Sequence, residues 1–255
     1  MPPKDSRIQA LRSSQNRFAE LVGPLDDAAL QTTSYAPDWT VAAVASHLGS
    51  QAEVFSLFLD AGLTGGDPPG IEAFRPIWDR WNALPPAEQR DGSVAGNEAL
   101  VRRVEGLTDA EWAAFDVEMF GSKPCIGEFA GIRLSEHAVH TWDIAVALDP
   151  RATLAPDATV LLVDGLPVLA ARAGRAPDGL HPTVVLTRAP DRVFSLTATE
   201  GKVALEPTDD PGAEPLTLPA EALIRLVHGR LDAEHTPADV DADAVAALRP
   251  AFPGF

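Results

Sequence analysis

The sequence predicts an α+β protein: a mainly helical domain over residues 1–150, followed by a smaller α+β domain over residues 151–255. In the first part, apolar side chains recur at helical spacing. After Pro156 the pattern changes, because Thr183–Thr187 is a β-branched apolar run and residues 192–199 alternate, as strands do. A length of 255 residues with 45% hydrophobic content is enough for two globular domains.

The helical part is predicted from its apolar spacing and its end signals. A first helix covers residues 8–22 and ends at Gly23-Pro24. A second begins at Thr40, whose hydroxyl can accept a backbone N–H of the first turn, and runs to residues 61–62. A third helical region, with an interruption, extends over residues 85–107. A glycine-rich irregular stretch over 121–131 precedes a fourth helix over 132–148, which ends at Asp149-Pro150.

The second domain is predicted to begin with a helix over residues 158–173, in which Pro167 can introduce a kink. Strands are expected at residues 183–187, 192–199 and 202–206, and another from Leu216 onward. Further helices are expected over residues 221–229 and 242–248. The strands of this half thus follow one another in a run with helices on either side, as in a small α+β domain.

Composition excludes several function classes. The net charge of −17 argues against binding nucleic acid or an anionic membrane surface. The apolar stretches fall short of the roughly 20 residues that span a bilayer, and no signal peptide is visible, so we expect a cytoplasmic protein. The single cysteine, Cys125, excludes an intrachain disulfide framework. Abundant Ala, Arg, Asp and Pro are typical of a GC-rich bacterial genome.

Glu136 and His140 carry the clearest chemical signal, together with His47 on an earlier predicted helix. Residues four apart lie one turn apart on the same helix face. A histidine on an apolar face is often a satisfied core residue, and a Glu–His pair is often only a surface contact. This helix is apolar on most sides, however, and a buried carboxylate needs compensation. Two histidines and one carboxylate suit a divalent transition metal with open coordination positions.

Three neighbouring residues have weaker signals. Asp143 follows His140 by three positions and is either the acceptor of the free ring N–H of His140 or a solvated acid near the helix end. His137 points about 100° away from Glu136 around the helix, which favours a structural or exposed position over a ligand role. Nothing in the sequence around Cys125 indicates a lowered thiol pKa, so this thiol is predicted to be buried or incidental.

Two segments resemble signatures of one family. Residues 39–48 (WTVAAVASHL) and residues 133–143 (RLSEHAVHTWD) are similar to two helix motifs of the mycothiol-dependent maleylpyruvate isomerase family. The resemblance implies a DinB-like four-helix bundle that binds a divalent metal, usually zinc, through His47, Glu136 and His140. It also implies a sterol-carrier-like C-terminal domain. Residues 226–230 (LVHGR) resemble a recurrent segment of that domain, which implies a catalytic position for Arg230; the alternative is a surface arginine at a helix end.

The leading functional hypothesis is a metal-dependent isomerase or transferase that uses mycothiol or a similar low-molecular-weight thiol on a small electrophilic substrate. A metal ion lowers the pKa of a thiol, and Arg230 can hold a substrate carboxylate. We expect a monomer or homodimer. One alternative is a metal-dependent hydrolase with Asp143 as general base. Another is a non-enzymatic small-ligand-binding protein with a structural metal, although structural zinc normally has four protein ligands and three are visible.

Overall fold

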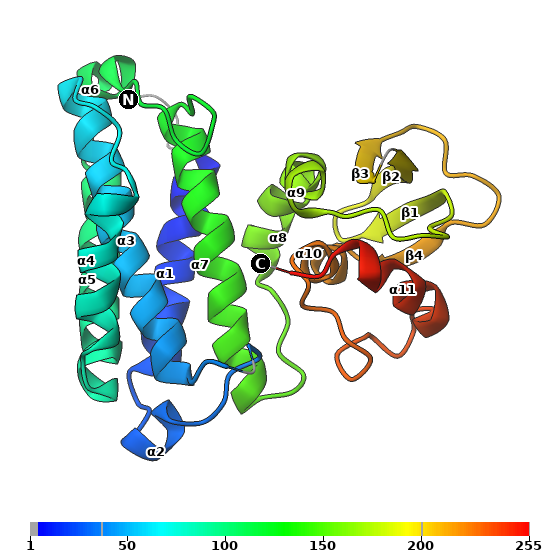
Figure 1. Ribbon diagram of the computed structural model, residues 1–255, viewed down its shortest axis with the longest axis horizontal. Coiled ribbons are helices and arrows are strands. Elements are labelled where there is room, and N and C mark those ends of the chain that lie inside the picture. Colours follow the sequence, from blue (N-terminus) through cyan, green and yellow to red (C-terminus); the bar gives the residue numbers. More distant parts are fainter. Residues whose placement is uncertain (1–4, 37, 200, 255) are drawn as a thin grey trace. The chain divides into compact units, whose positions relative to one another are not determined.

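The computed structural model describes residues 5–36, 38–199 and 201–254. The chain divides into two compact units, with the boundary between Ala152 and Thr153. The first unit is helical and the second combines helices with a sheet, which confirms the predicted α+β class (Figure 1). Within the described ranges, no helix has the length and apolar character needed to cross a membrane.

Long helices packed side by side form the first unit (Figure 1). Contacts join α3 to α5, α1 to α7, α1 to α5 and α3 to α7, so these helices form a four-helix bundle, and α4 packs along α3. The helices of this unit are α1 (Ser6–Val22), α2 (Asp27–Leu30), α3 (Val41–Thr64), α4 (Ile71–Asn82), α5 (Pro86–Glu105), α6 (Asp109–Ala114) and α7 (Ile126–Leu148).

Local capping sets where the long helices begin and end. The Thr40 hydroxyl accepts a hydrogen bond from the backbone N–H of Ala43 at 3.1 Å, which confirms the predicted N-cap of α3. At the other end of α3, Gly65 has a φ of 69°, a left-handed conformation that glycine adopts without the steric cost of a Cβ.

The structure of this unit differs from the sequence prediction at three places. Helix α4 was not predicted, and α7 begins at Ile126 inside the stretch that was expected to be irregular. The Glu128 carboxylate accepts the backbone N–H of Cys125 at 2.9 Å and thereby caps α7. The glycines in this part of α7 allow close packing and do not mark a loop, because a Cβ on Gly127 would lie 2.0 Å from Oδ2 of Asp5. The predicted interruption of the third helical region is also absent, since α5 is continuous.

A band of buried polar residues crosses the bundle core. One apolar cluster includes Phe55 and Phe129, and another includes Phe18 and Leu48. On each of α1, α3, α5 and α7, buried polar residues lie in sequence between members of these two clusters. This polar layer consists of Ser14, Gln15, Ser50, Asn97, Arg133 and His137. Because buried polar groups cost free energy unless they are hydrogen-bonded, the layer calls for an explanation beyond packing.

The second unit contains a mixed sheet, which within its described residues has the strand order β3-β2-β1-β4. Strand β1 pairs antiparallel with β2 and parallel with β4. The predicted helix over 158–173 is instead broken at a 3₁₀ turn, and Pro167 lies in the first turn of the helix that follows. The elements are α8 (Pro156–Leu162), η1 (Val163–Gly165), α9 (Leu166–Ala173), β1 (Thr183–Arg188), β2 (Arg192–Thr199), β3 (Lys202–Pro207), β4 (Leu216–Pro219), α10 (Ala220–Val227), α11 (Ala242–Leu248) and η2 (Arg249–Ala251).

Candidate metal centre

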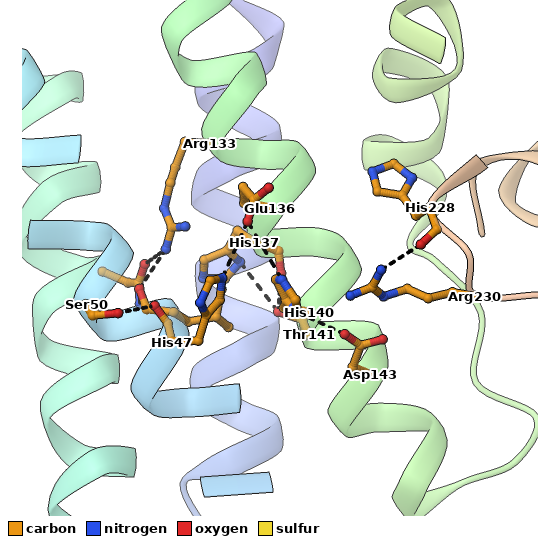
Figure 2. A network of polar contacts seen from close by, with 12 residues as sticks. His47, Ser50, Arg133, Glu136, His137, His140, Thr141, Asp143, His228 and Arg230 are labelled. Atoms are coloured by element: carbon orange, nitrogen blue, oxygen red, sulfur yellow. Dashed lines mark hydrogen bonds and ion pairs between the residues drawn. The ribbon is translucent and has the colours of Figure 1, made fainter. Parts of the chain in front are cut away.

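Three potential metal ligands converge between α3 and α7. Helix α3 contributes His47, while α7 contributes Glu136 and His140, and the three side chains point toward one another (Figure 2). One potential ligand atom from each residue lies within 4.8 Å of the other two. The Oε2 atom of Glu136 is 3.5 Å from Nε2 of His47 and 3.7 Å from Nε2 of His140. The structure therefore brings together the three residues that the sequence singled out.

The donor set fits a divalent transition metal. Among the described residues, Nε2 of His47 has no hydrogen-bond partner although it is buried. A buried ring nitrogen without a partner costs free energy unless something coordinates it. Two imidazole nitrogens and a carboxylate are ordinary ligands for zinc, and a set of three protein ligands leaves coordination positions open. The Glu136 side chain is 44% exposed, so the triad has access to solvent.

The charges around the triad favour the ligand-competent protonation states. Burial lowers the pKa of His47 and outweighs the opposing contact with Glu136, so His47 keeps a free lone pair at neutral pH. Burial raises the pKa of Glu136, but contact with His47 and the charges of His140 and Arg133 outweigh it and lower the pKa to about 2. Glu136 is therefore ionised over the physiological range.

Asp143 lies behind His140 and is completely buried. Its Oδ2 accepts a hydrogen bond from Nδ1 of His140 at 2.8 Å (Figure 2). Because one ring nitrogen carries the proton in neutral imidazole, this contact leaves the lone pair on Nε2, the atom that faces Glu136. Of the two readings of Asp143 that the sequence left open, the geometry agrees with the orienting one. A buried carboxylate engaged in this way is poorly placed to act as a general base.

Arg133 joins the helices that carry the ligands, a role that sequence reasoning missed. Its Nη2 donates to the backbone oxygen of Leu48, the residue after His47, at 2.9 Å, and also to Oδ1 of Asn97. The guanidinium lies over the Phe55 ring, 5.4 Å from its centroid. Burial lowers the pKa of Arg133 to about 10, against the opposing effect of the Glu136 charge, so it remains a cation at neutral pH. An arginine one turn before Glu136 on an apolar helix was the available signal.

His137 has a structural position, as one of the two predicted alternatives stated. Its ring is fully buried, and Nδ1 lies 2.9 Å from the Ser14 hydroxyl on α1. Phe18 contacts the ring edge to face, with 5.4 Å between centroids. Burial lowers the pKa of His137 well below its usual value, so the residue is neutral. These contacts turn His137 toward α1, and it is not part of the triad.

Two further candidates lie outside the triad. Arg230 follows α10 in the second unit, where its Nη1 donates to the backbone oxygen of His228 at 2.8 Å. Its predicted catalytic position stays a prediction. Cys125 lies at the N-cap of α7 and is exposed, so the prediction that this thiol is buried was wrong.

The fold resembles that of known enzymes. A crystal structure described as the mycothiol-dependent maleylpyruvate isomerase matches with a TM-score of 0.66 at 16% identity, covering 93% of this chain and 91% of the other. A crystal structure of a histidine-to-alanine mutant of that isomerase matches with a TM-score of 0.65 at 16% identity, covering 89% and 90%. At this identity the likeness concerns the fold. No curated protein matches the chain.

A match to a sequence family adds an independent observation. The sequence model of the mycothiol maleylpyruvate isomerase N-terminal domain matches residues 11–145. The matched range begins in α1 and ends in α7, so it includes all three residues of the triad. It also covers more than half of the chain. The chain therefore belongs to the mycothiol maleylpyruvate isomerase family.

Proposed function

We propose that this protein is a metal- and thiol-dependent enzyme that isomerises a small unsaturated acid. The observation that carries the proposal is the convergence of His47, Glu136 and His140, with ligand atoms within 4.8 Å of one another, in a chain of this family. Zinc is the proposed ion, because two imidazoles and a carboxylate suit it and leave open positions. Mycothiol, or a similar low-molecular-weight thiol, is the proposed cofactor.

The residues of the triad have distinct tasks in this proposal. His47 and His140 each offer Nε2 to the ion, and Glu136 offers an ionised carboxylate that balances part of its charge. Asp143 keeps the proton of His140 on Nδ1. When bound, the ion supplies a positive charge that lowers the pKa of a coordinated thiol, so that a nucleophilic sulfur is available at neutral pH.

Arg230 is proposed to bind a substrate carboxylate through its guanidinium, which can form two parallel hydrogen bonds to such a group. It lies in the turn after α10, where the residue before it, Gly229, has a φ of 73°. The C-terminal segment packs tightly on this turn, because a Cβ on Gly229 would lie 2.4 Å from Cα of Gly254. The unit that carries Arg230 is proposed to be the sterol-carrier-like domain.

The other candidate functions receive less support. A hydrolase of the kind considered above needs a general base beside the metal, and Asp143, the residue suggested for it, is buried and bonded to His140. A purely structural metal is expected to have a closed set of four protein ligands. The half-exposed Glu136 carboxylate at this triad is more typical of a site that admits a ligand.

Metal analysis combined with a thiol-dependent activity assay tests the proposal. Wild-type protein should hold stoichiometric zinc and should isomerise maleylpyruvate only when mycothiol is present. His47→Ala should lose both the zinc and the activity. His181→Ala, which changes an exposed histidine of the second unit, should keep both and serves as the matched control. Wild-type protein without bound metal, or activity that survives complete chelation, would overturn the proposal.

A further inference from the structure

The loop between α2 and α3 is held against α7, close to the triad. Within the loop, Thr33 and Thr40 form an isolated β-bridge, and Ser34 donates both its backbone N–H and its hydroxyl to the backbone oxygen of Trp39, each at 2.9 Å. The backbone N–H of Tyr35 donates to the backbone oxygen of Asp143 at 3.0 Å. The loop is thus anchored at the same residue that orients His140.

This anchoring places the Trp39 indole against two of the proposed ligands. Its ring centroid lies 5.1 Å from that of His47 and 6.1 Å from that of His140, and the indole is stacked on His140 with an interplanar angle of 21°. The two imidazole centroids are themselves 4.5 Å apart. Trp39 therefore forms one side of the triad.

Trp39 is also 36% exposed. Its position just before the N-cap of α3 does not explain why a large aromatic residue is exposed there. An apolar residue just before an N-cap often packs on the first turns of the helix, and a smaller aliphatic side chain serves that purpose. A large exposed aromatic surface beside a polar site is instead typical of a surface that binds a ligand. The indole thus combines an exposed surface with direct contact to two of the three proposed ligands.

We propose that Trp39 determines specificity at this site, because the planar unsaturated carbon skeleton of the substrate stacks on its indole. The inference deepens the proposed function, on which it rests. An aromatic face attracts flat conjugated groups and repels carboxylates, since its π-face is electron-rich. The indole thus favours the conjugated carbon atoms of an unsaturated acid and directs the carboxylates toward cationic groups. A saturated acid of the same charge gains little from this face.

A pair of matched probes separates this role from simple shielding of the imidazoles. Maleate and succinate are four-carbon dicarboxylates, and of the two only maleate has a planar carbon–carbon double bond. Binding of each probe is measured by titration calorimetry on zinc-loaded protein. Wild-type protein should bind maleate more tightly than succinate. Trp39→Leu should weaken maleate binding by about three- to tenfold, the contribution of one aromatic contact, and should leave succinate binding nearly unchanged.

Two more variants sharpen the comparison. Trp39→Phe keeps an aromatic face and should retain part of the preference for maleate. Trp112→Leu removes an indole from α6 that packs on the apolar cluster around Phe55, and it should leave the preference at the wild-type value. A ratio of maleate to succinate affinity that is the same in wild-type protein and Trp39→Leu would overturn the proposal. Equal binding of the two probes by wild-type protein would do the same.

Zinc content, measured on the same samples, keeps the two proposals apart. If wild-type protein holds zinc and the affinity ratio does not depend on Trp39, the specificity role fails and the metal centre stands. If wild-type protein binds no zinc, the metal-dependent function fails, and the same titrations on metal-free protein then test the stacking role: a ratio that depends on Trp39 supports it and a ratio that does not overturns it.

Discussion

Replacement of Asp143 gives a quantitative test of how the site is oriented. The carboxylate is fully buried and accepts the Nδ1 proton of His140 at 2.8 Å. Partners of this kind, which hold a ligand in its binding tautomer, typically contribute 10- to 100-fold to metal affinity, or about 1.4 to 2.8 kcal/mol. Asp143→Asn keeps the shape but loses the charge, and its amide can also donate to Nδ1 and stabilise the wrong tautomer.

We therefore expect zinc affinity to fall about 10-fold in Asp143→Asn and about 100-fold in Asp143→Ala, which leaves Nδ1 buried without a partner. Competition with a fluorescent zinc chelator of known affinity measures both values. Asp149→Asn is the matched control, because it removes an exposed carboxylate just after the same helix. Circular dichroism establishes that each variant is folded. Wild-type affinity in a folded Asp143→Asn protein would refute the reasoning.

Three further predictions concern stability and are measured by urea denaturation. Thr40→Ala removes the N-cap of α3 and should lower the free energy of unfolding by about 1 kcal/mol. Ser14→Ala leaves the buried Nδ1 of His137 with only the Thr141 hydroxyl at 3.5 Å and should cost about 1 kcal/mol. Gly229→Ala places a Cβ 2.4 Å from Cα of Gly254 at a φ of 73°, which should cost about 1–3 kcal/mol for the backbone strain and more for the clash.

Each of these has an outcome that contradicts it. Thr40→Ser keeps the capping hydroxyl. If it lowered the free energy of unfolding as much as Thr40→Ala does, packing of the threonine methyl and not capping would explain the effect. An unchanged unfolding midpoint in Ser14→Ala would mean that the Thr141 hydroxyl fully replaces the lost contact to Nδ1 of His137. Full stability of Gly229→Ala would mean that the C-terminal segment moves away from this turn at little cost.

The sequence predicted those parts of the fold and site that depend on local spacing. Glu136 and His140 are four residues apart, so any helix through them presents both on one face, and the Thr40 cap fixes where the His47 helix begins. Helix α4 escaped prediction because Pro76 lies inside it and proline normally interrupts a helix.

Features that depend on tertiary contacts could not be read from spacing. The early start of α7 depends on glycines that make room for α1, as the close approach of Asp5 to Gly127 shows. The position of Trp39 depends on the hydrogen bond between the backbones of Tyr35 and Asp143, which are more than a hundred residues apart. Chain patterns carry no information about such long-range pairs.

The polar layer connects the stability of the bundle to the geometry of the triad. Its hydrogen bonds join α1 to α7 through Ser14 and His137, and α7 to both α3 and α5 through Arg133. A slip of α3 by one turn relative to α7 would displace His47 by about 5.4 Å, which exceeds the 4.8 Å that now contains the ligand atoms.

The same slip would separate the Arg133 guanidinium from the Leu48 carbonyl, and a hydrogen bond to a charged group contributes about 1.5–3 kcal/mol. Apolar side chains alone tolerate such shifts better, because hydrophobic contacts are not directional. The buried Arg133 cation therefore lies at the level where α3 and α7 must stay in register. This register keeps His47 beside Glu136 and His140.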